Sequence, residues 1–154
     1  MNNAFVTRRQ LISGAAGLGA WVLVRPATAQ TEPELAAALA AYAGNQKITE
    51  GKVKLDIAEL VDNGNVVPMT VTVTSPMTLA NHVKTIAVFN EKNPQRDVVK
   101  FTLGSRYGKA DVSTRIRLAT TQKLVAVAQM SDGSFWSHTV EVIVTLAACI
   151  ETEA

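Results

Sequence analysis

The residue with the most distinctive chemistry in this 154-residue chain is its single cysteine, Cys149, which stands close to the carboxyl end. A thiolate sulfur is a good nucleophile, and its disulfide and persulfide adducts form and break reversibly. Chain ends are poorly ordered unless they are tied down, and the polar residues 151–154 offer little to bury. A cysteine placed there is suited to carrying a covalent intermediate between the active sites of other proteins.

The same cysteine has two simpler explanations. A lone cysteine cannot close a disulfide within its own chain, so it can crosslink to another chain or merely pack as a small apolar residue. Glu151, Glu153 and the terminal carboxylate surround the sulfur and should disfavour the thiolate. The basic residues that would offset these charges, if the arm folds back over them, are Arg106, Lys109, Arg115 and Arg117.

Other side chains that could bind a metal or act in catalysis lack the spacing that such sites need. Side chains of the types that bind copper are present at His82, His138, Met69, Met77 and Met130. No two of them stand at a motif spacing, which favours surface or packing roles. The chain also has no Gly-x-Ser-x-Gly nucleophile elbow. We therefore expect no catalytic residue, no metal and no cofactor.

The first 29 residues have the pattern of a twin-arginine export signal. Arg8 and Arg9 precede an apolar, glycine-interrupted stretch over 11–24, and Ala-Thr-Ala at 27–29 supplies a cleavage site. We expect a mature periplasmic chain that starts near Gln30 and has no membrane anchor once the signal is removed. Loss of the leader's three arginines takes the net charge from +2 to −1, so nucleic acid is not an expected partner.

Turn residues divide the mature chain into one helix and about seven short strands. Residues 31–34 have the pattern of a capping box for an amphipathic helix over 35–42, which Gly44 ends. The β-rich runs are 52–57, 66–74, 82–90, 97–103, 111–118, 122–130 and 135–147. This number of short strands is typical of an all-β sandwich. We expect one domain over 30–148 and an arm over 149–154 that carries Cys149.

The strand patterns also predict which residues face the core. In 111–118 and 140–147 the residues expected to point inward are Val112, Thr114, Ile116, Leu118, Val140, Val142, Val144 and Leu146. Arg115 and Arg117 should point outward. The runs 82–90 and 122–130 are apolar on both faces, which indicates central strands or an outer face that a partner covers. The turn at 131–134 should deliver Phe135 and Trp136 to the sandwich, and a partner-facing Trp136 is the alternative.

Several segments together are more informative than any one of them. They are DNGNVVP at 62–68, SPM at 75–77, FNEKNP at 89–94, STRIRL at 113–118, SDGSFW at 131–136 and the terminal cysteine. With the leader and the short helix, they resemble SoxY, the sulfur-carrier subunit of the periplasmic thiosulfate-oxidising system, over essentially the whole mature chain. The resemblance implies an immunoglobulin-like sandwich, a SoxZ-like partner subunit, and covalent attachment of sulfur at Cys149 for processing by partner oxidoreductases.

The arm departs from the glycine-flanked pattern of that family. Ala147, Ala148, Ile150 and Glu151 flank the cysteine, so the chain resembles most closely the SoxY-related subgroup with an Ala-Ala-Cys-Ile-Glu arm. Ile150 is β-branched and stiff, and Glu151 is charged, so this arm differs physically from a glycine tether. We expect a non-enzymatic sulfur carrier. The alternative is a non-catalytic binding or structural module whose Cys149 packs against a partner or crosslinks to it.

Overall fold

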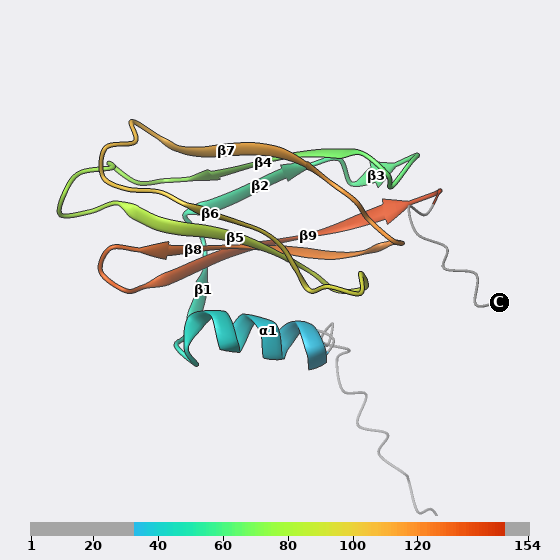
Figure 1. The fold of residues 1–154 in the computed structure, drawn as a ribbon, viewed down its shortest axis with the longest axis horizontal. Helices are drawn as coiled ribbons and strands as arrows, with labels where there is room; N and C mark the ends of the chain where they lie inside the picture. Colours follow the sequence, from blue (N-terminus) through green and yellow to red (C-terminus); the bar gives the residue numbers. More distant parts are fainter. Residues whose placement is uncertain (1–32, 147–154) are drawn as a thin grey trace, which may run out of the picture. The chain divides into compact units, whose positions relative to one another are not determined.

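Two stacked β-sheets and one helix make up residues 33–146, the part of the chain that the computed structural model describes (Figure 1). In chain order the elements are α1 (Pro33–Ala43), β1 (Ile48–Glu50), β2 (Val53–Ile57), β3 (Leu60–Val61), β4 (Val67–Val73), β5 (Val83–Asn90), β6 (Asp97–Thr102), β7 (Ala110–Ile116), β8 (Gln122–Met130) and β9 (Phe135–Val144). The expected sandwich with a short helix at its start is confirmed.

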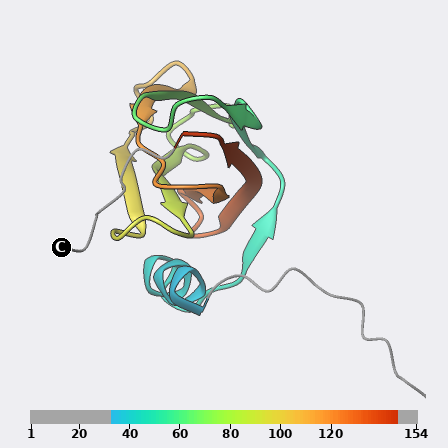
Figure 2. The same cartoon turned by 90° about the vertical axis from the view of Figure 1, so that its right-hand side faces the viewer.

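The larger sheet has the strand order β1-β9-β8-β5-β6, with β3 also pairing with β9, and the smaller sheet has the order β2-β4-β7. The short strands β1 and β3 run parallel to β9, whereas the other pairs are antiparallel. Figure 2 shows the two sheets around a shared interior, with α1 outside the larger sheet. Strands β6 and β7 are therefore the outer strands on one side of the sandwich.

The main core lies between the sheets because each strand turns alternate residues inward. In β4, every second residue from Val67 to Val73 is buried, with no more than 4% exposed. The expected inward set of β7 is confirmed, since Ile116 and Leu118 are buried and Val112 and Thr114 are half-buried, while Arg115 and Arg117 are exposed. This alternation fixes the outward direction of the two arginines.

Helix α1 explains why two strands are apolar on both faces. Strands β5 and β8 are central in the larger sheet, which is the first of the two explanations given above for their apolar residues on both faces. Their outer-face side chains form a second cluster with the helix: Leu35, Ala43, Ala87, Phe89, Val125, Val127 and Phe135. Tyr42 completes it with edge-to-face contacts to Phe89 and Phe135 at centroid distances of 5.4 and 5.8 Å. The chain thus covers this apolar face with its own helix.

The helix ends as the sequence predicts, and an ion pair fixes its beginning. Gly44 and Asn45 take positive φ values of 60° and 61°, and the Asn45 amide donates to the Ala40 carbonyl. Glu34 in the first turn pairs with Arg96, which joins the helix to the loop before β6. The expected capping residues 31 and 32 lie outside the described residues. Within 33–146, no helix is long and apolar enough to cross a membrane.

Two expectations about β9 and its neighbours were wrong. The sequence did not predict strands β1 and β3, because strands of three and two residues carry almost no periodic signal. Leu146 was expected in the core, but it is 65% exposed. The reason is that β9 ends at Val144, after which the backbone leaves the ladder with β8 and bonds to the segment that follows β3.

Candidate functional site

The candidate site residue, Cys149, lies outside the described residues, but the structure describes the chain up to Leu146, three residues earlier. Covalent geometry keeps the Cα atom of Cys149 within about 11 Å of that of Leu146. Whatever acts on the thiol must therefore come close to the end of the sandwich where β9 finishes. The fold of that end is the part of the site that can be built from the residues.

The end of β9 is held by hydrogen bonds on both edges. On one side the Val144 amide donates to Thr121 Oγ1 at 3.0 Å. On the other side the amides of Thr145 and Leu146 donate to the carbonyls of Val61 and Asp62 at 3.0 and 3.2 Å. These bonds continue almost to the point where the arm begins, so the arm starts from a fixed base.

Gly64 connects this base to the end of β7. Its amide donates to the Leu146 carbonyl at 2.9 Å, and its carbonyl accepts from the Leu118 amide at the same distance. The turn is shaped locally by Asn63, whose Oδ1 accepts from the amide of Asn65 at 2.9 Å, as in an Asx turn. The DNG segment at 62–64 thus forms a turn, as its residue types predict, and the structure adds its hydrogen bonds to Leu146 and Leu118.

A second network organises the neighbouring loop. Asn93 Oδ1 accepts hydrogen bonds from the Ala119 amide and from Gln122 Nε2, at 2.9 and 2.7 Å, and its Nδ2 donates to the Arg117 carbonyl at 2.8 Å. The Asn93 amide in turn donates to Oδ1 of Asn90, a side chain only 1% exposed. The FNEKNP segment at 89–94 therefore joins the loop before β6 to the loop after β7. Sequence reasoning identified the segment but not this function.

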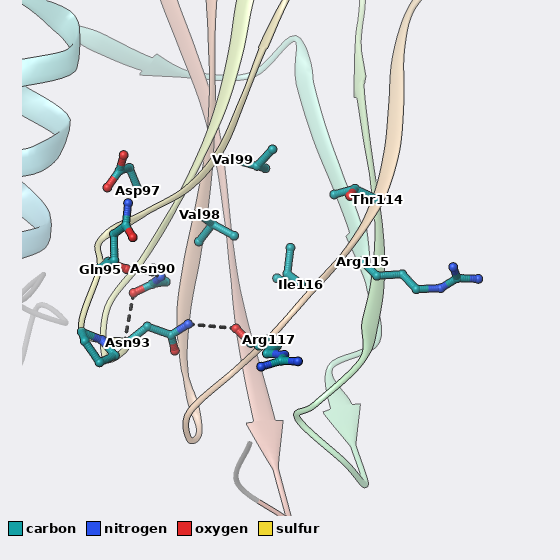
Figure 3. A pocket seen from close by; sticks show the side chains of 11 residues that line it. Asn90, Asn93, Gln95, Asp97, Val98, Val99, Thr114, Arg115, Ile116 and Arg117 are labelled. Atoms are coloured by element: carbon teal, nitrogen blue, oxygen red, sulfur yellow. Dashed lines mark hydrogen bonds between the residues drawn. The ribbon is translucent and has the colours of Figure 1, made fainter. Parts of the chain in front are cut away.

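Beside this network, a groove of about 480 Å³ opens between β6 and β7 (Figure 3). Val98 and Val99 line it from β6, and Ile116 and Arg117 line it from the other side. Arg115 also borders it, and its side chain points away from the valines in Figure 3. Of the basic residues named as possible partners of the acidic arm, Arg115 and Arg117 are thus the two at this groove.

Two exposed apolar side chains also lie near the root of the arm. Leu60 and Ile143 are direct partners in the pairing of β3 with β9, and they are 61% and 50% exposed. They belong to the same end as Leu146. A protein that reaches Cys149 would approach this small apolar surface.

The histidines and methionines have structural contacts. Met69, Met77 and Met130 are buried in the core between the sheets. His138 Nδ1 accepts a hydrogen bond from the Leu55 amide at 3.1 Å and so links β9 to β2, and His82 Nδ1 donates to the Thr78 carbonyl at 3.0 Å. Among residues 33–146, no group of three or more His, Cys, Asp or Glu side chains is placed to hold a metal.

The turn at 131–134 is also structural. Hydrogen bonds from the Ser134 hydroxyl and amide hold the pKa of Asp132 below its ordinary value. Trp136 Nε1 donates to Ser134 Oγ at 3.1 Å, and Lys52 Nζ lies 4.4 Å from the centroid of the indole ring. Gly51, with a φ of 120°, lies against the same ring. Trp136 is half-buried by contacts within its own chain.

The chain is similar in sequence and in structure to known proteins of one family. The family model described as sulfur oxidation protein SoxY matches residues 39–149. The structure of the sulfur carrier protein SoxY from Chlorobium limicola f thiosulfatophilum is 33% identical, with a TM-score of 0.62, over 73% of this chain and 96% of that one. No curated protein matched the chain in a sequence search.

Other solved structures share only the fold. The superoxide reductase (neelaredoxin) from Ignicoccus hospitalis is 19% identical, with a TM-score of 0.55, over 61% of this chain and 80% of that one. The superoxide reductase from Nanoarchaeum equitans is 13% identical, with a TM-score of 0.53, over 62% of this chain and 100% of that one. Because the SoxY model spans most of the chain and the SoxY structure aligns over nearly its full length, this chain belongs to the SoxY family of sulfur oxidation proteins.

Proposed function

We propose that this chain is a periplasmic sulfur carrier whose Cys149 is the covalent attachment point for sulfur intermediates. Membership of the SoxY family supports a carrier role. The observation that carries the assignment to Cys149 is that the segment matched to the family ends at this residue, the only cysteine in the chain. A thiol is also the one side chain present that forms reversible bonds to sulfur.

The geometry of the described residues supports this proposal. A carrier needs a thiol that can enter other proteins and a base that stays in place when it does. The hydrogen bonds of Val144, Thr145 and Leu146 supply the base, and the short segment from Leu146 to Cys149 supplies the reach. The chain itself performs no catalysis in this proposal, because partner oxidoreductases form, oxidise and release the adduct.

We also propose pairing with a SoxZ-like subunit and export by the leader over 1–29. The outer face of β5 and β8 is occupied by α1, so the pairing surface lies elsewhere while the helix is docked. The leader pattern supports a periplasmic location, where the partner oxidoreductases would meet the carrier. Western blotting of periplasmic and cytoplasmic fractions tests the location, and a leader variant with Arg8 and Arg9 changed to Lys should be retained in the cytoplasm.

The carrier role is tested by intact-protein mass spectrometry of protein purified without reductant. We expect adducts in steps of about 32 Da, or a thiosulfonate, on Cys149, and none on the matched variant Cys149→Ser. Alkylation of the native thiol by iodoacetamide should be about as fast as in the unfolded protein. Slow native labelling or a reducible dimer on electrophoresis, with no adduct, would instead support a packing or crosslinking role.

A further inference from the structure

We propose that the free edge of β7 is a docking site for a partner protein that adds an extended strand of alternating acidic and apolar residues. The added strand lies in the groove between β6 and β7 and continues the smaller sheet beyond β7. Its acidic side chains stand beside Arg115 and Arg117, and its apolar side chains face the interior. The docking site consists of sandwich residues alone and does not require that Cys149 carries sulfur.

Both sheets have an unpaired edge at this groove. Within residues 33–146, β7 pairs only with β4, and β6 pairs only with β5. The two edge strands border the groove of about 480 Å³ from opposite sides (Figure 3). An edge strand with unpaired backbone groups is a template for pairing with another extended segment. This is therefore a side of the sandwich to which a strand can be added.

The register of the smaller sheet identifies which backbone groups of β7 are free. The Thr74 amide donates to the Lys52 carbonyl, so the even-numbered residues of β4 direct their backbone groups toward β2 and the odd-numbered ones toward β7. Ser113 pairs with the even-numbered Thr70, so the backbone groups of Ser113 point away from β4. The hydroxyl oxygens of this pair lie 2.8 Å apart, the close approach typical of a pair without backbone hydrogen bonds.

The free groups extend over most of β7. By the same alternation, Asp111 and Arg115 also direct their backbone groups to the free edge. Within the described part of the chain, no hydrogen bond occupies the edge groups of residues 111, 113 and 115. The next edge group is the Arg117 carbonyl, which accepts from Asn93 Nδ2 at 2.8 Å. A partner strand can therefore pair with β7 from Asp111 to Arg115, and Asn93 closes the edge beyond that point.

The side chains at the groove determine the chemistry of the added strand. Its residues would alternate between the interior and the outer face, as those of β7 do. Val98, Val99 and Ile116 line the interior side, which favours apolar side chains. Arg115 and Arg117 are exposed, and among residues 33–146 neither has an ion-pair partner. A strand that fits both sides therefore alternates apolar with acidic residues.

The distribution of charge along the chain also favours an acidic partner on this side. The segment 92–117, which contains β6 and β7, has seven lysines and arginines but only two acidic residues. The rest of the described chain, 33–91 and 118–146, has five lysines and arginines and eight acidic residues. A surface of one sign attracts partners of the opposite sign and repels those of its own. The same repulsion disfavours pairing between the β7 edges of two copies.

A synthetic peptide tests the docking site directly. The probe is a capped peptide of about seven residues, the length of β7, in which glutamate alternates with valine, and its matched control has lysine in place of glutamate. Nuclear magnetic resonance of the mature protein reports binding through the backbone amide signals. The acidic peptide should shift the amide signals of Ser113 and Arg115 and slow their hydrogen exchange. It should affect Lys54, on the opposite edge of the same sheet, much less. The lysine peptide should change none of them.

Charge variants test the role of the arginines. Arg115→Gln/Arg117→Gln should raise the dissociation constant of the acidic peptide about threefold or more. Lys47→Gln/Lys54→Gln removes the same number of charges from exposed residues elsewhere and should leave the dissociation constant close to that of wild type. Arg115→Glu/Arg117→Glu should reverse the preference, so that the lysine peptide binds and the acidic peptide does not.

A backbone variant tests the strand pairing itself. Ser113→Pro removes an N–H group that points to the free edge and that the pairing with β4 does not use, so it should weaken binding about threefold to tenfold. Ser113→Ala also loses the hydroxyl contact with Thr70 but keeps the N–H group, and it should bind as wild type does.

Two results would overturn the docking site. One is the absence of shifts at Ser113 and Arg115 with the acidic peptide at about 5 mM, a concentration that reveals even a millimolar dissociation constant. The other is equal binding of the acidic and lysine peptides to the wild-type protein. None of these measurements involves Cys149, so the docking site succeeds or fails separately from the carrier role.

Discussion

Asn93 connects the loop before β6 with the loop after β7. Its side chain bonds to three groups of the segment that joins β7 to β8, including the amide of Gln122, which is 1% exposed. The sequence predicted the segment as part of a family pattern, but a hydrogen-bond network between distant loops has no periodic signature. The structure was needed to show that this asparagine positions the end of β7 and hence the arginines beside the groove.

Replacement of Asn93 should destabilise the protein. Asn93→Ala removes three hydrogen bonds and leaves the buried Gln122 amide without its acceptor, so we expect the free energy of unfolding to fall by about 1–3 kcal/mol. Urea denaturation followed by circular dichroism measures this. Gln95→Ala, an exposed side chain in the same loop, is the matched control and should change the value by less than about 0.5 kcal/mol. Equal effects of the two variants would show that the network is unimportant.

Tyr42 predicts a pH dependence in the alkaline range. Burial between α1 and the larger sheet raises its pKa above the ordinary value of 10.0, although a hydrogen bond with Thr85 Oγ1 at 2.5 Å acts in the opposite direction. The folded state therefore favours the neutral phenol. Its contribution to stability is complete below the unfolded pKa and is lost as the pH rises through the folded pKa.

The measurement is urea denaturation at several pH values on both sides of pH 10. Wild type should lose more stability above this pH than Tyr42→Phe, which has no proton to release at this position. Tyr107→Phe, at a residue 55% exposed, serves as the control and should follow the wild-type curve. A Tyr42→Phe curve that falls as steeply as wild type would contradict the assignment.

At the scale of elements, the structure shows which surface α1 packs against, which the sequence did not predict. The two-sided apolar pattern of β5 and β8 predicted either central strands or an outer face that a partner covers; the strands are central, and α1 packs on their outer face. The seven longer strands were predicted to within about two residues at most ends, because alternation and turn residues mark them clearly. The parallel strands β1 and β3 were not predictable, since they depend on backbone bonds to a distant strand.

Loss of the helix contact should expose the face of the larger sheet. Leu35 is fully buried against it, so Leu35→Ala should reduce the free energy of unfolding by about 2–5 kcal/mol. Increased binding of the dye ANS would report the apolar face that becomes accessible. Leu79→Ala, at a side chain 86% exposed, should change neither quantity appreciably. If ANS binding is unchanged and stability falls little, the helix is not the cover that we describe.

At the scale of the whole molecule, the proposed carrier combines the sandwich with a short segment that bears the thiol. The described sandwich contributes the hydrogen-bonded end of β9, a groove bordered by Arg115 and Arg117, and a sheet that α1 covers. The family and fold were predictable because several segments act together over the full domain. The exposed position of Leu146 was not predictable, because the exact end of β9 depends on its hydrogen bonds with the turn at 62–64.

The most direct test of the carrier role follows the mass of Cys149 in cells. The protein is recovered without reductant from bacteria that are fed reduced sulfur compounds, then starved of them, and the peptide containing Cys149 is analysed by mass spectrometry. We predict sulfur adducts that accumulate during feeding and disappear during starvation, with unmodified thiol at the end. A Cys149 that stays unmodified under every feeding condition would contradict the carrier role.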